Sequence, residues 1–161
     1  MDVEIREYTK NDLVSLIHLS SDQWAPTIEN LQETVLPNYD GKNIKILLAS
    51  SGEEIIGFIY GYISPDKALF PEYLYVKPEY RGQRIGLRLL DELEKQSGCF
   101  SSMIFYNSSL HNYYTAQGYE TNNLEAALKD LREVRKQRII EDTVSRIKEY
   151  LEKEKTDGTN N

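Results

Sequence analysis

Mostly apolar runs rich in β-branched and aromatic residues, as in β-strands, occur in the first half of the chain. Two such runs occupy residues 44–49 and 54–63, and a Ser-Ser-Gly turn separates them. Runs of this length joined by a short turn predict a β-hairpin. A further run at residues 73–76 predicts another strand. Pro71 cannot donate a ladder hydrogen bond, so this strand either begins at Glu72 or carries a bulge.

Apolar residues recur at helical spacing elsewhere. Residues 3–8 alternate as a strand, and Thr9 with Asp12 three residues later then predicts the start of a helix. Residues 27–36 predict a second helix. Apolar residues spaced three and four apart over 85–96 predict a third. The chain therefore combines strands and helices in one α/β or α+β arrangement.

A glycine-bearing turn joins the strand at 73–76 to the helix at 85–96. Gly82 and Gly86 let the backbone approach a ligand closely, and the first turn of a helix offers unpaired N–H groups. Arg81, Arg84 and Arg88 add three cations, which favours a pyrophosphate over a lone carboxylate. The alternative is an ordinary strand-to-helix connection with solvated arginines.

This stretch, V-K-P-E-Y-R-G-Q-R-I-G-L-R-L-L from Val76, resembles the acetyl-coenzyme-A binding segment of the GNAT N-acetyltransferase superfamily. Arg81 opens the family pattern and Gly86 closes it, while Arg84 stands where the family has its first glycine. We expect ordinary helical dihedral angles at Arg84, whose side chain can reach a phosphate. The resemblance implies that the donor is held by Leu74, Tyr75, Val76, Arg81, Gly82, Gln83, Arg84, Ile85, Gly86 and Leu87.

A second signature of the same family lies downstream. Asn107, Tyr114, Gly118 and Tyr119 stand at its spacing, with Leu110 where the family usually has alanine. The resemblance implies that Asn107 contacts the pantetheine or phosphate arm and that the Tyr114 hydroxyl faces the sulfur. A free thiol has a pKa of about 8.5, so an acid that protonates the departing sulfur helps the intermediate collapse. Tyr113, on the same helix, is interpreted as a packing residue.

The acceptor side is assigned to two residues. An amine of pKa near 10 must lose its proton before it attacks, and the Glu72 carboxylate is the candidate general base. The alternative is a surface carboxylate at the rim of the cleft. In relatives the region between the first two helices overhangs the acceptor, so Trp24 is a candidate wall of the amine pocket; alternatively it packs the helices together. A backbone N–H near Val76 would meet the oxyanion.

The resemblance covers residues 3–120. It implies a mixed, mostly antiparallel central sheet with splayed parallel strands, flanked by helices. Relatives usually add a strand after the Gly-aromatic pair, but here about thirty helix-favouring residues follow. They carry two apolar stripes that are out of phase around Arg138, which predicts a kink or two helices. The stripes are Leu124, Leu128, Leu131 and Val134, then Ile140, Val144, Ile147 and Leu151.

These patterns divide the chain into a GNAT domain at residues 1–122, a C-terminal helical arm at 123–155 and a disordered tail at 156–161. The second stripe has heptad spacing and balanced charges, which favours a homodimer formed through the arm or another protein partner. The alternative is a helix that lies on its own domain.

Composition agrees with a soluble domain, since the 161 residues are 40% hydrophobic and 28% charged. Residues 1–120 carry 10 Lys+Arg against 17 Asp+Glu. This acidic surface disfavours nucleic acid and favours a cationic amine. The single cysteine, Cys99, is interpreted as a packing residue and not as a nucleophile. We expect no metal site, no membrane span and a cytoplasmic protein.

The sequence thus predicts an acetyl-CoA-dependent N-acetyltransferase that acts on a primary amine of a small molecule or peptide by direct attack in a ternary complex. Tyr114 and Glu72 are its expected acid and base. The alternative is a non-catalytic acyl-CoA-binding module that acts through its C-terminal helix.

Overall fold

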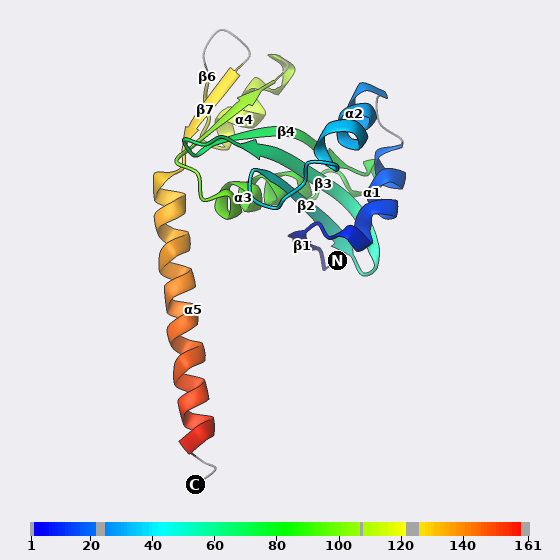
Figure 1. The fold of residues 1–161 in the computed structure, drawn as a ribbon. Helices are drawn as coiled ribbons and strands as arrows, with labels where there is room; N and C mark the ends of the chain where they lie inside the picture. Colours follow the sequence, from blue (N-terminus) through cyan, green and yellow to red (C-terminus); the bar gives the residue numbers. More distant parts are fainter. Residues whose placement is uncertain (1, 22–24, 107, 122–125, 159–161) are drawn as a thin grey trace.

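The computed structural model describes residues 2–21, 25–106, 108–121 and 126–158. Within these residues the centre of the fold is a seven-stranded sheet with the order β1-β2-β3-β4-β5-β7-β6 (Figure 1). Its strands are β1 (Glu4–Glu7), β2 (Ile44–Ser51), β3 (Glu54–Ile63), β4 (Ala68–Val76), β5 (Ser101–Phe105), β6 (Glu120–Thr121) and β7 (Ala126–Asp130).

Helices cover both faces of the sheet and connect its strands. The α-helices are α1 (Leu13–Ser20), α2 (Ala25–Asn30), α3 (Ile85–Ser97), α4 (His111–Ala116) and α5 (Arg132–Gly158). A π-helical turn, η2 (Leu31–Val35), continues α2. Short 3-10 turns are η1 (Lys10–Asp12), η3 (Pro78–Tyr80) and η4 (Ser108–Leu110). The hairpin and the first three helices predicted from the sequence are all present.

The sheet is mixed, as predicted. Every strand pair is antiparallel except β4 and β5, which run parallel. These two strands pair only at Ala68 with Ser101 and at Leu69 with Ser102. Beyond these pairs the ladder ends, so the two strands diverge over the rest of their length. The predicted splay of parallel strands is confirmed, and it opens the middle of the sheet.

Two apolar cores lie on opposite faces of the sheet because alternate strand residues point to opposite sides. Along β2, Leu47 and Ala49 belong to the core that also holds the apolar side of α3. Ile46 and Leu48 belong to the other core, which contains residues of α1 and η2. The strands are therefore held from both sides, and the ends of β4 and α3 are fixed relative to each other.

A β-bulge interrupts β4 at Glu72. Tyr73 pairs with Tyr60 of β3, but Pro71 pairs with the next residue, Gly61, so Glu72 has no opposite partner on β3. The strand starts at Ala68, ahead of Pro71, and the bulge alternative predicted from the proline is confirmed. A bulge re-aims the side chain that it carries, and such irregularities are common next to active sites.

The C-terminal boundary predicted from the sequence is wrong. Residues 126–130 form strand β7, which pairs with β5 on one side and β6 on the other, so the helical arm does not begin at residue 123. The run Ala126–Asp130 favours a helix by local propensity. Pairing with β5 and complete burial of Ala127 outweigh that preference. The chain thus returns to the sheet after the Gly-aromatic pair, as the resemblance implies for the family.

A buried polar network fixes β7 against α3. Glu94 is 2% exposed, and its carboxylate accepts hydrogen bonds from the Tyr119 hydroxyl at 2.8 Å and from Lys129 Nζ at 2.8 Å. The Tyr119 and Ser102 hydroxyls lie 2.9 Å apart. Burial raises the pKa of Glu94 while Lys129 opposes the shift. The network joins α3, β5, β7 and the turn after α4.

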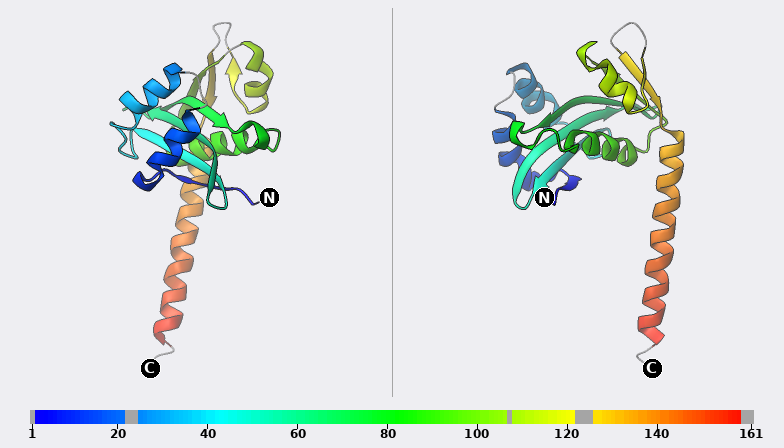
Figure 2. Two further views of the ribbon diagram at one scale, coloured as in Figure 1. Left: turned by 90° about the vertical axis from the view of Figure 1, so that its right-hand side faces the viewer. Right: turned by 180° about the vertical axis from the view of Figure 1, so that it is seen from behind.

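One helix, α5, ends the described chain and extends away from the sheet in all views (Figures 1 and 2). Neither the predicted kink nor a division into two helices is observed. Its continuous hydrogen bonding includes Thr156 and Gly158, so this part of the tail is helical, contrary to the prediction; residues 159–161 lie outside the described range. In the part of the chain that the structure describes, no helix has both the length and the apolar character needed to cross a bilayer.

Candidate active site

The turn between β4 and α3 is shaped by Arg81 and two special backbone positions. Arg81 Nε donates a hydrogen bond to the Val76 carbonyl at 2.8 Å, and its guanidinium lies 5.6 Å from the centre of the Tyr75 ring. Gly82 has φ +77°, a conformation that favours glycine. The Arg81 side chain therefore closes the turn instead of serving only as a free cation.

Arg84 adopts the left-handed conformation, with φ 62° and ψ 15°. The ordinary helical dihedral angles predicted for it are wrong. Arg84 precedes the first helical residue, Ile85, and caps α3, a place where the chain must change direction. A non-glycine residue in this region carries backbone strain of about 1 kcal/mol or more. The arginine keeps the backbone shape that a glycine would supply.

The third predicted cation is directed elsewhere. Arg88 Nη2 donates a hydrogen bond to the Val3 carbonyl at 2.8 Å and so ties α3 to the N-terminal segment. Of the three arginines that the sequence assigned to a pyrophosphate, Arg81 and Arg88 make these intramolecular bonds. Arg84, at the N-terminus of α3, is left as the best-placed cation for an anion there.

A cavity of about 470 Å³ lies beside this turn. Nine of the ten turn and strand residues predicted to hold the donor line it, and Gln83 does not. Its lining residues are Leu74, Tyr75, Val76, Tyr80, Arg81, Gly82, Arg84, Ile85, Gly86, Leu87 and Tyr113. Asn107, the remaining predicted donor contact, lies outside the described residues.

Gly86 forms part of the cavity wall at the first turn of α3. A Cβ atom at this position would lie 3.4 Å from Leu74 Cδ2 and 3.6 Å from the Tyr113 hydroxyl. These are ordinary contact distances, so the protein itself leaves room for a methyl group. The absence of that methyl widens the cavity where the helix N-terminus meets it.

A smaller cavity of about 40 Å³ lies where β4 and β5 diverge. Glu72 lines it from the bulge of β4, and Tyr114 lines it from α4. Leu74 lines both cavities, so the two lie next to each other. The predicted acid and base are therefore brought to one small space next to the larger cavity.

Aromatic rings surround Tyr114. Its ring centre lies 5.1 Å from that of Tyr113, 5.4 Å from that of Tyr106 and 5.9 Å from that of Tyr119. Burial raises the pKa of the Tyr114 phenol above its ordinary value of 10.0. The hydroxyl is therefore protonated at neutral pH and has a proton to give.

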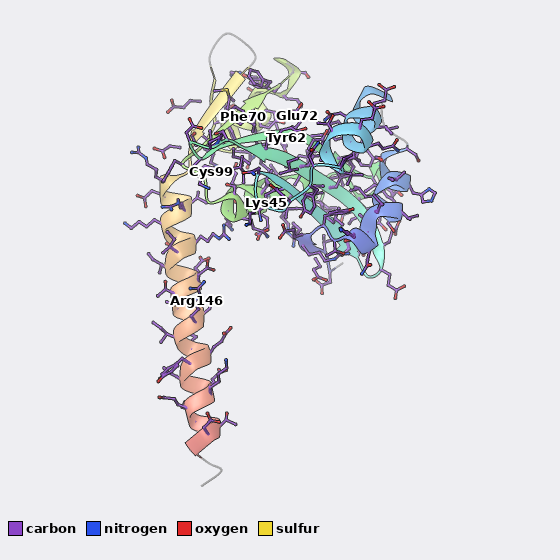
Figure 3. All side chains as sticks on the ribbon, in the orientation of Figure 1. Lys45, Tyr62, Phe70, Glu72, Cys99 and Arg146 are labelled. Carbon is purple, nitrogen blue, oxygen red and sulfur yellow. The ribbon has the colours of Figure 1, made fainter. Side chains whose placement is uncertain are left out.

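Aromatic residues also line the sheet face near Glu72, the face covered by α1 and α2. Tyr62 of β3 pairs directly with Phe70 of β4, and Figure 3 shows both near Glu72. The Tyr60 hydroxyl accepts a hydrogen bond from Asn30 Nδ2 of α2 at 3.0 Å. Burial is the largest cause that raises the pKa of Tyr60 to about 12, and the hydrogen bond from Asn30 opposes it. Nearby groups that include Glu72 raise this pKa further. The Glu72 side chain itself is exposed.

Comparison with known proteins decides the family. Residues 42–121 match the model of the acetyltransferase (GNAT) domain. This match covers the hairpin, the glycine turn and the Tyr114 segment. The chain belongs to the GNAT superfamily of N-acetyltransferases.

Individual GNAT relatives agree with this assignment. The chain is 26% identical over 152 residues to a spermidine N(1)-acetyltransferase of Thermoplasma acidophilum, with 79% of this chain and 94% of the relative covered. The solved structure of PaiA N-acetyltransferase from Thermoplasma acidophilum in complex with coenzyme A has 25% identity and a TM-score of 0.64, with 81% and 99% covered. A GNAT acetyltransferase from Staphylococcus aureus Mu50 has the same fold at 17% identity and a TM-score of 0.65, with 81% and 100% covered.

The structure of this GNAT protein adds two aromatic residues to the predicted cavity lining. Tyr80 lies within the family stretch that begins at Val76, but no function was predicted for it. Tyr113 was interpreted as a packing residue. Both line the larger cavity. The signal that could have found Tyr113 is its place beside Tyr114, because neighbouring residues on a short helix reach adjacent parts of one cleft.

Two further predictions concern residues away from these cavities. Cys99 is buried, and burial raises the pKa of its thiol, as expected for a packing residue. Trp24, the predicted wall of the amine pocket, lies outside the described residues. Across the described ranges, no group of three or more His, Cys, Asp or Glu side chains is arranged to hold a metal ion.

Proposed function

We propose that this GNAT protein transfers an acetyl group from acetyl-CoA to a primary amine of a small molecule or peptide by direct attack within a ternary complex. The observation that carries the proposal is the adjacency of the two cavities through Leu74. A donor bound along the larger cavity would present its thioester to the smaller one, where Glu72 and Tyr114 lie.

The donor is assigned to the larger cavity. The backbone N–H groups at the start of α3, with Arg84, would bind the pyrophosphate, because a helix N-terminus favours negative charge. Apolar side chains such as Leu74 and Leu87 would contact the pantetheine arm. Asn107 is a further proposed donor contact, and Gln83, which does not line the cavity, is assigned none. The Thermoplasma acidophilum PaiA structure is a complex with coenzyme A, which supports coenzyme A as the ligand.

The proposed chemical step uses Glu72 as the base and Tyr114 as the acid. The Glu72 carboxylate, directly or through water, takes the proton of the bound ammonium group. The freed nitrogen attacks the thioester carbonyl, and a backbone N–H near Val76 stabilises the oxyanion. As the intermediate collapses, the C–S bond breaks and Tyr114 gives its proton to the sulfur, while the nitrogen releases its second proton to the resulting phenolate, directly or through water. The products are an N-acetyl amide and free coenzyme A.

The acceptor is assigned to the class of small cationic amines, and a polyamine is the first candidate. Glu72 supplies a negative charge, and the Tyr62 and Phe70 rings beside it offer faces that attract cations. The acidic balance of residues 1–120 strengthens attraction of a multiply charged amine. The spermidine N(1)-acetyltransferase among the relatives supports the same class. Trp24 is proposed to wall this pocket.

Product analysis with steady-state kinetics tests the proposal. Spermidine, a short monoamine and a peptide with a free N-terminus are each incubated with acetyl-CoA, and the products are identified by mass spectrometry. We expect an acetylated amine, intersecting double-reciprocal plots and no acetyl group on the protein. Parallel plots with a covalently acetylated protein would contradict direct attack. A higher kcat/KM for the monoamine than for spermidine would contradict the polyamine assignment.

A further inference from the structure

We propose that α5 pairs with α5 of a second copy of this chain in an antiparallel coiled coil, which makes the protein a homodimer in solution. This inference does not depend on the identity of the amine acceptor. It begins with the exposure of the helix, because every residue from 139 to 158 is exposed.

Apolar side chains on this exposed helix are concentrated in a stripe. Ile140, Val144, Ile147 and Leu151 are spaced four, three and four residues apart and are 45–54% exposed. At about 100° per residue they share one narrow side of the helix. Spacing of this kind is the a and d pattern of a two-stranded coiled coil. A row of exposed aliphatic residues on a projecting helix indicates an interface.

The stripe faces away from its own domain. Arg138 Nη1 donates hydrogen bonds to the carbonyls of Lys95 and Gln96, at 2.8 and 2.6 Å, at the end of α3. Arg135 Nε donates to the Gly98 carbonyl at 3.1 Å. Ile147 follows Arg138 by nine residues, which on a helix is half a turn away from the anchored side. The other described residues of the same chain therefore do not cover the stripe.

Charge along α5 favours an antiparallel partner. Residues 132–140 carry four cations and one acid, whereas residues 141–158 carry six acids and four cations. Antiparallel pairing places the basic beginning of each helix beside the acidic end of the other. It also places the opposite ends of the two helix dipoles side by side. A parallel pair would set like segments together.

The heptad positions define one symmetric register. In an antiparallel pair, a positions pack against d positions, so Ile140 would meet Leu151 of the second copy and Val144 would meet Ile147 of the second copy. The flanking e and g positions then face their equivalents. Glu141 would lie near Lys148 of the second copy, and Lys136 near Asp157 of the second copy. Each of these two contacts occurs twice by symmetry, and both join opposite charges.

A groove extends this interface at the base of the helix. Ile140, the first residue of the stripe, also lines a groove of about 430 Å³ together with Phe100, Arg132, Arg135, Lys136 and Ile139. The proposed register places the end of the partner helix beside this groove. Four apolar layers alone form a short coiled coil, and the groove supplies additional apolar and cationic surface.

Light scattering coupled to gel filtration tests the dimer with the full chain. We expect wild type to have twice the 18.7 kDa mass of one chain and Val144→Glu to have the mass of one. Ser145→Glu is the matched control, because it adds the same charge on the neighbouring residue, away from the stripe, and should leave the dimer intact. Circular dichroism checks that all three chains keep their helices. A wild-type mass of one chain at roughly 100 μM protein, or equal dissociation by both variants, would overturn the proposal.

Charge reversal tests the antiparallel register. Lys148→Glu and Glu141→Lys should each weaken the dimer about tenfold, because each places two like-charged pairs at the interface. The double variant restores opposite charges across the antiparallel pair and should regain most of the wild-type affinity. In a parallel pair Glu141 would instead face Lys136, so the double variant would stay weak. That outcome in sedimentation equilibrium would overturn the antiparallel arrangement.

Discussion

Glu72 and Tyr114 line the same small cavity, one from the bulge of β4 and the other from α4. The two residues come from distant parts of the chain. They meet because β4 and β5 stop pairing after two residue pairs and leave a gap that α4 borders. This arrangement brings the proposed proton acceptor and the proposed proton donor to one cavity.

Replacement of Glu72 tests the proposed base. We expect Glu72→Gln to lower kcat/KM for the amine by about 10²-fold or more near neutral pH, where the amine is protonated. The deficit should shrink as the pH rises toward the amine pKa of about 10, because free amine then needs no base. A pH series of kcat/KM measures both effects. Glu53→Gln, an exposed carboxylate in the β2–β3 turn, is the control. A deficit that does not change with pH would contradict the role.

Replacement of Gly86 tests donor binding without an expected loss of stability. In Gly86→Ala the new methyl would make only ordinary contacts with Leu74 and Tyr113, and alanine favours a helix over glycine by up to about 1 kcal/mol. We therefore expect unchanged or higher stability, measured by urea unfolding. The methyl narrows the cavity, so coenzyme A affinity measured by calorimetry should fall about tenfold or more. Gly158→Ala, where nothing lies within 4 Å of the added Cβ, is the control. Unchanged affinity would place the donor elsewhere.

The left-handed conformation of Arg84 has a measurable consequence for stability. Glycine adopts φ 62° without strain, although it loses more chain entropy on folding. We expect Arg84→Gly to raise the free energy of unfolding by about 0.5–1 kcal/mol and to weaken coenzyme A binding. Gln83→Gly, at a neighbouring position without positive φ, should not stabilise the protein. Stabilisation by both variants, or by neither, would show that the conformation at Arg84 is not the cause.

The ion pair between Arg6 and Asp12 makes stability depend on pH. Two hydrogen bonds, at 2.8 and 2.7 Å, join the guanidinium to the carboxylate and hold the pKa of Asp12 at about 2. Because this pKa lies below the ordinary value of 3.8, the stabilisation is present above about pH 4 and is lost as the pH falls toward 2. We expect Asp12→Asn to cost about 1–2 kcal/mol at pH 7.

Urea unfolding at pH 7, 5 and 3 measures this effect. The difference between wild type and Asp12→Asn should narrow at the lowest pH. Glu4→Gln, an exposed acid in β1, should show a much smaller difference at every pH. A cost for Asp12→Asn that is equal at pH 7 and pH 3 would show that the ion pair does not cause it.

The sequence was most informative where one local pattern decides the backbone. The apolar runs at 44–49 and 54–63 and the short turn between them predict the hairpin correctly, since pairing between adjacent strands depends on nearby residues. Pro71 likewise indicates the bulge, because its missing N–H cannot be supplied by any tertiary contact. The family signatures then placed most of the cavity lining.

The sequence was least informative where distant residues decide the outcome. The segment Ala126–Asp130 becomes a strand because β5 offers a pairing partner and the Glu94 carboxylate accepts a hydrogen bond from Lys129. Neither contact can be recognised from the local composition of the segment. Arg88 binds the Val3 carbonyl instead of an anion for the same reason. Arg84 shows a related limit: propensity predicts a helical conformation, but the change of direction before α3 requires a left-handed one.

The central claim is tested most directly by Tyr114→Phe, with Tyr113→Phe as the matched control on the same helix. Thiol release from acetyl-CoA in the presence of an amine measures turnover, and calorimetry measures coenzyme A binding. We expect Tyr114→Phe to keep coenzyme A affinity and lose about 10²-fold or more in kcat, while Tyr113→Phe mainly weakens coenzyme A binding. Wild-type turnover in Tyr114→Phe, or coenzyme A binding without any amine-stimulated release in the wild type, would contradict the proposed mechanism.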